Sequence, residues 1–361
     1  MSGTVLVALL MKLTMLTPLP LMLKGDTAVS VSTGTDPASV AQVSSPPQVL
    51  RPPQPSFGSD RLDQQIWLYE QYLQTQGRPD VLIVGSSRSL QGIDPAALEQ
   101  ALIQRGHAPL RIYNFSINGA TARVVDLVLT RILTADQLPR LIIWGDGLRA
   151  FNSGRPDLTY RSIAASEGYR SLARGDRPIQ ASATPSAENC QTVSSVQLCL
   201  GQANLYLPEV NAFSVATNLQ PNGFEPIATR FDPASYYRSR SRVPGRYDSS
   251  YVPFNLNGEQ IAATVQVARF ARSQQIPLVV VNLPLTRDYL DAARQNFEQQ
   301  FRQRMQTLAA REGFVFRDYS LRWPTQTGNF ADPSHLNQAG AIAVARDLAA
   351  DPTIPWPRDR F

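Results

Sequence analysis

The stretch VLIVGSSRSLQG, residues 81–92, carries the pattern that decides the fold. Four consecutive apolar residues lead into Gly85 and a pair of serines, which is typical of a buried strand that ends in a polar turn. A helical pattern follows over residues 94–106, where Asp94 and Pro95 suit the cap and the first position of a helix. A strand followed directly by a helix is half of a parallel strand–helix–strand unit.

The same alternation continues on both sides of this stretch. A helix is expected at residues 60–77, where Gly77 ends it, and the later elements repeat the order strand, helix, strand. The expected strands lie at 110–116, 138–145, 277–285 and 314–320, and the expected helices at about 124–133, at 258–275, around 297–308 and after 337. This order predicts an α/β domain with five parallel strands and helices on the faces of the sheet.

Composition divides the chain into further segments. Residues 1–24 form an apolar leader, interrupted by Lys12 and two prolines, which we interpret as a signal sequence or membrane anchor. Residues 25–57 are rich in Ser, Thr and Pro and predict a linker to the domain at 58–361. Between about 150 and 255 the periodicity is lost, which predicts a large irregular insertion after the third strand. We therefore expect an exported protein on the extracytoplasmic side, either attached to a membrane by its N-terminus or released from it by cleavage of the leader.

The charge pattern does not fit a nucleic-acid-binding surface. The chain has 361 residues and a formal net charge of +5, but its arginines are scattered and mixed with acidic residues. The sequence contains no GxGxxG, no phosphate-binding loop with its lysine and no HExxH, so we expect neither a cofactor nor a metal. Its lysines, Lys12 and Lys24, both lie in the leader, which excludes lysine catalysis within the domain.

Two cysteines, Cys190 and Cys199, lie close together within the predicted insertion. Their spacing allows a local disulfide, which would form in an oxidising compartment. A metal site is a weaker interpretation, because no histidine lies nearby to complete a set of ligands. A pair of free thiols remains the alternative.

Four polar stretches fall at predicted carboxyl ends of strands, where open parallel sheets bind their ligands. They are GSSRS, NFSINGAT, WGDGLRAFN and DPSHLN. In the last stretch, the spacing of Asp332 and His335 allows the carboxylate to hold one ring nitrogen while the other faces a serine. Ser86 and Ser87 are the candidate nucleophiles. The structural alternative is that the serines cap a helix or turn and that His335 packs beside the start of the helix that follows it.

These residues resemble the short sequence blocks of the SGNH, or GDSL-type, hydrolase superfamily. The first block, G-D-S, is matched by residues 85–87 with serine in place of aspartate, and Gly119 matches the second. Asp332 and His335 match the final D-x-x-H, whereas the third block, G-x-N-D, has no match in residues 143–154. The resemblance implies a flavodoxin-like three-layer α/β/α sandwich with a mostly parallel five-stranded sheet.

The resemblance also implies acyl transfer by a Ser-His-Asp mechanism. Ser87 would attack an ester, His335 would carry the proton and Asp332 would orient the histidine. The backbone N–H groups of Ser87 and Gly119 would bind the developing oxyanion. Because the third block is missing, the side-chain donor of that site is open, and the substitutes in this sequence are Asn152 and Arg149.

The first block in its GSS form is similar to that of a membrane-associated protein of teichoic-acid D-alanylation. Related export-side proteins O-acetylate alginate, and the overall pattern resembles a cyanobacterial family of unknown function. We therefore expect an exported or membrane-tethered serine esterase or O-acyltransferase that acts on a cell-envelope glycan or lipid ester. The first alternative is an inactive protein of the same fold that binds glycans or assists assembly. The second is nucleotide binding at the turn of residues 85–92.

Overall fold

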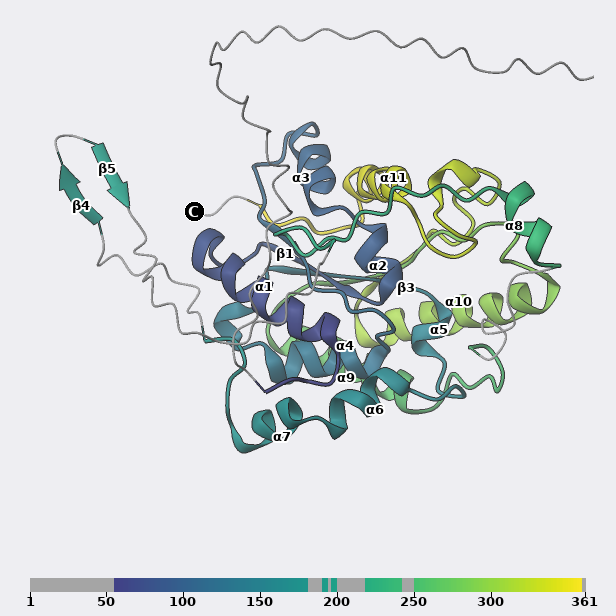
Figure 1. The fold of residues 1–361 in the computed structure, drawn as a ribbon, viewed down its shortest axis with the longest axis horizontal. Coiled ribbons are helices and arrows are strands. Elements are labelled where there is room, and N and C mark those ends of the chain that lie inside the picture. Colours follow the sequence, from purple (N-terminus) through teal and green to yellow (C-terminus); the bar gives the residue numbers. More distant parts are fainter. Residues whose placement is uncertain (1–54, 181–189, 194–195, 200–217, 242–249, 359–361) are drawn as a thin grey trace, which may run out of the picture. The chain divides into compact units, whose positions relative to one another are not determined.

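The computed structural model describes residues 55–180, 190–193, 196–199, 218–241 and 250–358 (Figure 1). The predicted leader and nearly all of the predicted linker therefore lie outside the described residues. Within the described ranges, no helix has both the length and the apolar character needed to cross a membrane.

A five-stranded sheet forms the centre of the fold, and all of its neighbouring strands are parallel. Its strands are β1 (Val81–Gly85), β2 (Ile112–Asn114), β3 (Leu141–Asp146), β6 (Leu278–Asn282) and β7 (Val315–Asp318). They are arranged in the order β2-β1-β3-β6-β7. Counted along the chain, this is the order 2-1-3-4-5 of flavodoxin-like sheets. The predicted fold class is confirmed.

Helices cover both faces of the sheet, which makes three layers (Figure 1). One face carries α1 (Asp60–Gln76), α4 (Ala122–Leu127) with a π-helical turn (Val128–Ile132), α9 (Glu259–Ser273) and α10 (Ala292–Glu312). The other face carries α3 (Pro95–Ile103) and α11 (Gln338–Ala350). The short helix α2 (Ser87–Gly92) follows β1, and 3-10 turns lie at Ala135–Gln137 and Thr327–Asn329.

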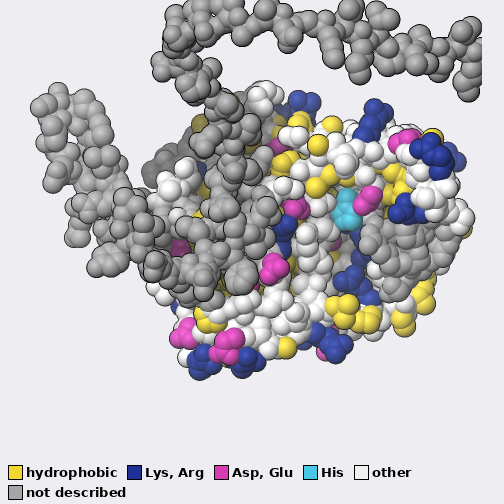
Figure 2. Space-filling model, viewed as in Figure 1, with side chains coloured by type: hydrophobic (Ala, Val, Ile, Leu, Met, Phe, Trp, Pro, Cys, Tyr) yellow, Lys and Arg dark blue, Asp and Glu magenta, His cyan; other side chains and the backbone are white. Residues whose placement is uncertain are grey.

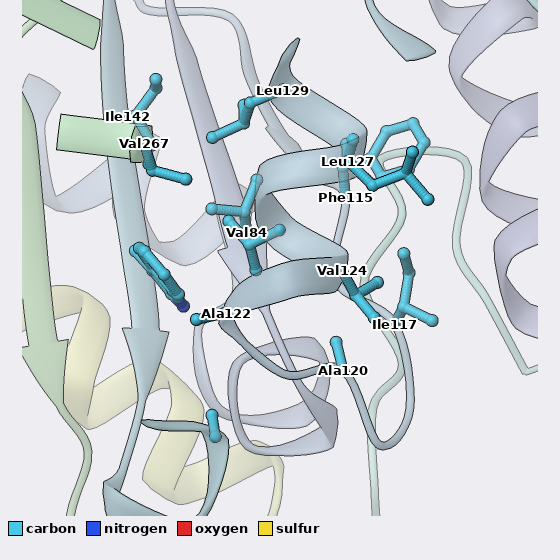
Figure 3. Close-up of a cluster of buried hydrophobic side chains, with 14 of the residues drawn as sticks. Val84, Phe115, Ile117, Ala120, Ala122, Val124, Leu127, Leu129, Ile142 and Val267 are labelled. Atoms are coloured by element: carbon cyan, nitrogen blue, oxygen red, sulfur yellow. The ribbon is translucent and has the colours of Figure 1, made fainter. Parts of the chain in front are cut away.

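The strand side chains alternate between two hydrophobic cores, as the pleat of a strand requires. Leu82 and Val84 of β1 belong to the first core, whereas Val81 and Ile83 belong to the second. Figure 3 shows the first core, where side chains of α4 and the following turn pack near Val84. Because both faces of β1 are buried, its sequence is a continuous apolar run rather than an alternating pattern.

The predicted insertion is less irregular than expected. It contains α5 (Leu148–Phe151), α6 (Leu158–Ala165), α7 (Glu167–Arg174), α8 (Pro233–Ser239) and the strands β4 (Cys190–Val193) and β5 (Val196–Cys199). The three longer helices begin at side-chain caps, supplied by Asp157, Ser166 and Asp232. Each helix has eight residues or fewer, which is too short for a helical period to be recognised in the sequence.

The strands β4 and β5 form an antiparallel pair, separate from the central sheet. Their register places the backbone of Cys190 opposite that of Cys199. Their side chains are outside the description, so the predicted disulfide stays a prediction.

Candidate active site

The candidate site lies where the carboxyl ends of β1 and β3 meet the turn before α11. Since β2 lies on one side of β1 and β3 on the other, this is the point at which the strand order reverses. A cavity of about 240 Å³ opens here, lined among others by Ser87, Gly119, Asp146, Arg149, Arg155 and His335. Figure 2 shows one histidine side chain on this face, with acidic and basic side chains beside it.

Ser87, His335 and Asp332 form a continuous hydrogen-bond chain. The distance from Ser87 Oγ to His335 Nε2 is 2.9 Å, and that from His335 Nδ1 to Asp332 Oδ2 is 2.7 Å. An ionised carboxylate only accepts hydrogen bonds, so Nδ1 carries the proton and Nε2 accepts from the serine hydroxyl. This is the arrangement in which a histidine can act as the base for a serine nucleophile. Nucleotide binding at the turn requires a turn free of the histidine, and this contact rules that out.

The environment of Asp332 keeps its carboxyl group ionised. Burial raises the pKa of Asp332, but the hydrogen bond and charge of His335 and two backbone N–H groups lower it by more. The N–H groups of Ser334 and His335 donate to Oδ1 at 2.7 and 2.9 Å. The net result is a pKa well below the usual range, so this carboxylate can hold the imidazole ring in one orientation and stabilise its charged form.

The two serines after β1 have different contacts. Ser86 caps α2, since its Oγ accepts from the N–H of Arg88 at 3.3 Å. Ser87 is the first residue of that helix, and its hydroxyl is directed to His335. The turn also requires glycine at position 85, because its φ is +145° and a Cβ there would lie 2.1 Å from the carbonyl oxygen of Gly145.

Asp146 is a site residue that the sequence analysis did not single out. Its Oδ2 accepts from the N–H of Ser86 and its Oδ1 from the Ser86 hydroxyl, both at 2.9 Å. Burial raises the pKa of Asp146 to about 6, against the lowering effects of Arg88, Ser86 and Gly147. This carboxylate therefore fixes the serine turn to the end of β3. The only signal in the sequence is its place in the polar stretch WGDGLRAFN.

The side chain of Arg88 links α2 to the end of β3 and to the loop after β6. Its side chain is buried, and it donates to the backbone carbonyls of Asp146 at 3.3 Å, of Pro284 at 3.1 Å and of Leu283. Burial lowers the pKa of Arg88, and the charge of Arg149 lowers it further. These hydrogen bonds fix Arg88, the residue next to Ser87, against β3 and the loop after β6.

Two backbone N–H groups are available to an oxyanion. Neither Ser87 nor Gly119 donates its N–H to another described residue. For Ser87 this follows from its position, because the first N–H groups of a helix have no acceptor within it. Gly119 has a φ of +73°, and a Cβ there would lie 2.7 Å from Thr159 Oγ1. Both residues line the cavity, as the oxyanion prediction requires.

The structure does not support Asn152 as an oxyanion donor. Its side chain is fully buried, and Nδ2 donates to the carbonyls of Ser250 at 3.0 Å and Pro253 at 3.1 Å. Its Oδ1 accepts from the N–H groups of Gly154 at 3.0 Å and Asn255 at 2.8 Å. Since the amide has no donor left, Asn152 is a structural link between two loops.

Arg149, the other predicted side-chain donor, does line the cavity. Its Nη2 donates to Ser334 Oγ at 3.5 Å, and its guanidinium carbon lies 5.7 Å from the centre of the Tyr289 ring. Arg149 therefore belongs to the wall of the cavity.

Across the described ranges, no group of three or more His, Cys, Asp or Glu side chains has an arrangement that could hold a metal ion.

Comparisons with known proteins identify only distant structural similarity. No family model and no curated protein sequence matches the chain. Among solved structures, it is similar to a mutant of Axe2, an acetyl-xylooligosaccharide esterase from Geobacillus Stearmophilus, with 12% identity and a TM-score of 0.39 over 79% of this chain and 99% of the other. It is also similar to TesA, with 14% identity and a TM-score of 0.34 over 74% of this chain and 93% of the other. A catalytic mutant of the acetylxylan esterase Axe2 from Geobacillus stearothermophilus has 13% identity and a TM-score of 0.40, over 79% of this chain and 99% of its own. Identities and TM-scores this low transfer no activity to the present chain.

Proposed function

We propose that this chain is a serine esterase or O-acyltransferase of the SGNH type, with Ser87 as its nucleophile. The observation that carries the proposal is the hydrogen-bond chain from Asp332 through His335 to Ser87. Ser87 and His335 line a cavity that also presents two N–H groups without acceptors among the described residues. A nucleophile, a base, a group that orients the base and an oxyanion site are the four parts that acyl transfer needs.

The first half of the reaction forms an acyl-enzyme. His335 Nε2 takes the proton of Ser87 as Oγ attacks the ester carbonyl carbon, and the carbonyl oxygen becomes negative. The N–H groups of Ser87 and Gly119 donate to this oxygen, while Asp332 stabilises the charged imidazole. The tetrahedral intermediate then collapses, the ester C–O bond breaks, and His335 returns its proton to the leaving alcohol.

The second half releases the acyl group. Water, or a hydroxyl of an acceptor, gives its proton to His335 and attacks the acyl carbon. When the bond to Ser87 Oγ breaks, His335 protonates the serine. Water as the acceptor makes the protein an esterase, and a sugar hydroxyl makes it an O-acyltransferase.

The proposed setting of this reaction is the extracytoplasmic side of a membrane. The apolar residues 1–24 and the Ser- and Pro-rich residues 25–57 support an exported protein on a membrane tether. An ester on a cell-envelope glycan or lipid is the substrate class that fits such a location. The leader lies outside the described residues, and the support for this part comes from the sequence.

A fluorophosphonate probe on the full-length protein tests the chemistry. We expect covalent labelling at Ser87, mapped by mass spectrometry, and loss of labelling in His335→Ala. The matched control is Ser86→Ala, which removes the neighbouring hydroxyl and should still be labelled. If the folded wild type is not labelled, the proposal fails. The missing third sequence block would then favour the alternative, a binding protein of the same fold.

A further inference from the structure

Two arginines line the same cavity as the proposed nucleophile. Arg149 lies in α5, and Arg155 lies four residues beyond the end of that helix. Among the described residues, no carboxylate forms an ion pair with Arg155. Its Nε is shielded from solvent and has no hydrogen-bond partner there. A half-buried guanidinium that forms no ion pair and leaves a shielded N–H without an acceptor is costly unless a ligand supplies the missing partner.

The loop that carries Arg155 is fixed before any ligand binds. The amide of Asn152 bonds four backbone groups across this loop and residues 250–255. Gly154 lies directly against the facing segment, since a Cβ there would be 1.8 Å from the carbonyl oxygen of Pro253. The backbone that carries Arg155 is therefore held in a rigid turn, which lowers the entropy cost of ordering this residue on binding.

The two carboxylates whose charges act on Arg155, those of Asp146 and Asp157, form hydrogen bonds to other residues. Asp146 accepts three hydrogen bonds from Ser86 and Gly147. Asp157 accepts from Thr121 Oγ1 at 2.7 Å, from Gln260 Nε2 at 2.8 Å and from the N–H of Tyr160 at 3.0 Å.

Burial and then the charge of Arg149 lower the pKa of Arg155, although Asp157 and Asp146 partly offset this effect. An anion between the two guanidinium groups would relieve their repulsion.

We infer that the cavity binds an ester that carries an anionic group, such as a carboxylate, a few bonds from its scissile carbonyl. Arg149 and Arg155 would bind this anionic group, since guanidinium groups match the geometry of carboxylate and phosphate oxygens. Ligand pockets typically measure about 300–1,000 Å³. This cavity of about 240 Å³ is smaller, and Ser87 and both arginines line it, so one small ester can contact the nucleophile and the arginines together. The inference rests on the proposed function and narrows its substrate class.

Binding without turnover gives the first test. In full-length Ser87→Ala, isothermal titration would compare monomethyl glutarate, which carries one carboxylate, with neutral dimethyl glutarate. We expect the charged ester to bind about 10-fold to 100-fold more tightly, because hydrogen bonds to charged groups contribute about that factor. Adding Arg155→Gln should remove most of the preference, and Arg155→Lys should restore part of it. Arg105→Gln, an exposed arginine in the loop after α3, is the matched control.

Hydrolysis rates then locate the charge. Mono-p-nitrophenyl glutarate carries the carboxylate on the acyl side, and p-nitrophenyl pentanoate is its neutral match. Acetylsalicylate carries it on the alcohol side, with methyl acetylsalicylate as its match. We expect the charged member of one pair to have a kcat/KM at least about tenfold higher, and Arg155→Gln to reduce that ratio. The pair that shows the preference identifies the side on which the natural substrate is charged.

The outcomes separate this inference from the proposed function. Labelling of Ser87 without any preference for charged esters would overturn the anion site and leave the proposed function intact. Anion binding that depends on Arg155, without labelling of Ser87, would overturn the proposed function and leave the anion site. If Arg155→Gln lowers kcat/KM equally for charged and neutral esters, the arginine stabilises the oxyanion that forms during the reaction. This result would also overturn the anion site.

Discussion

The polar stretches after β1 and after β3 look alike in sequence but contribute to the site in different ways. After β1, Ser86 turns inward as a cap and leaves Ser87 beside the histidine. At the end of β3, Asp146 accepts hydrogen bonds from Ser86, and after β3 the amide of Asn152 forms all of its hydrogen bonds within its own loop and with residues 250–255. The comparison teaches that a position at the carboxyl end of a strand is not enough. A side chain can serve a ligand only when it faces the cavity and its hydrogen-bonding capacity is not fully taken by the surrounding fold, as that of Asn152 is.

The largest expected effect separates the two serines. Ser87→Ala should lower kcat/KM for an activated ester by about 10⁴-fold or more, because it removes the atom that attacks the carbonyl. Ser86→Ala removes a helix cap, which typically contributes about 1 kcal/mol, and its main effect should be on stability. Steady-state kinetics and urea unfolding of both variants check this. Similar kinetic losses in both would contradict the division of roles.

The next effect concerns the group that orients the histidine. Asp332→Asn should lower kcat by about 10³-fold to 10⁴-fold, because an amide in place of the carboxylate favours the wrong imidazole tautomer. Thermal unfolding at the same pH shows whether the variant is folded. A folded variant that retains more than a tenth of its rate would show that Asp332 only caps the turn.

Asn152 tests the stretch after β3 directly. Asn152→Ala leaves four backbone groups without their partners, and we expect a loss of about 2–4 kcal/mol in the free energy of unfolding, measured in urea. Removing a side-chain oxyanion donor instead costs about 10²-fold to 10³-fold in kcat. A stable Asn152→Ala variant with a kinetic loss of that size would restore the predicted oxyanion role.

The smallest effect is the pH dependence that Asp146 gives to stability. Its pKa is raised from 3.8 to about 6, so between these values the folded protein binds more protons than the unfolded chain. Stability should therefore fall as the pH rises through this window. The shift of about two units corresponds to at most about 3 kcal/mol.

In Asp146→Asn this titration is absent. The free energy of unfolding of the wild type, minus that of the variant, should therefore decline between about pH 4 and pH 6. Urea titrations at both pH values measure the difference. A difference that stays constant or increases with pH would show that Asp146 is not the group that titrates.

Local patterns in the sequence were sufficient to predict most helices and strands of the domain and one contact in the site, that between Asp332 and His335. The apolar run of β1, the Asp94 cap and Gly77 each act over a few residues, and the structure has these elements where the sequence predicts them. The contact between Asp332 and His335 is equally local, since they lie three residues apart in one turn. The short helices of the insertion were missed because they span too few turns to show a period.

Only the tertiary structure decided which polar atoms are free. The serine turn meets Asp146 across 60 residues, Arg88 meets Leu283 across 195, and Asn152 meets Pro253 across 101. The sequence by itself determined the chemical groups and the end of the sheet at which they gather. Whether each group is hydrogen-bonded within the protein or available to a ligand depends on partners from distant parts of the chain. The reason is that nearly all buried polar atoms in a folded protein form hydrogen bonds, and only the fold determines which partners are within reach.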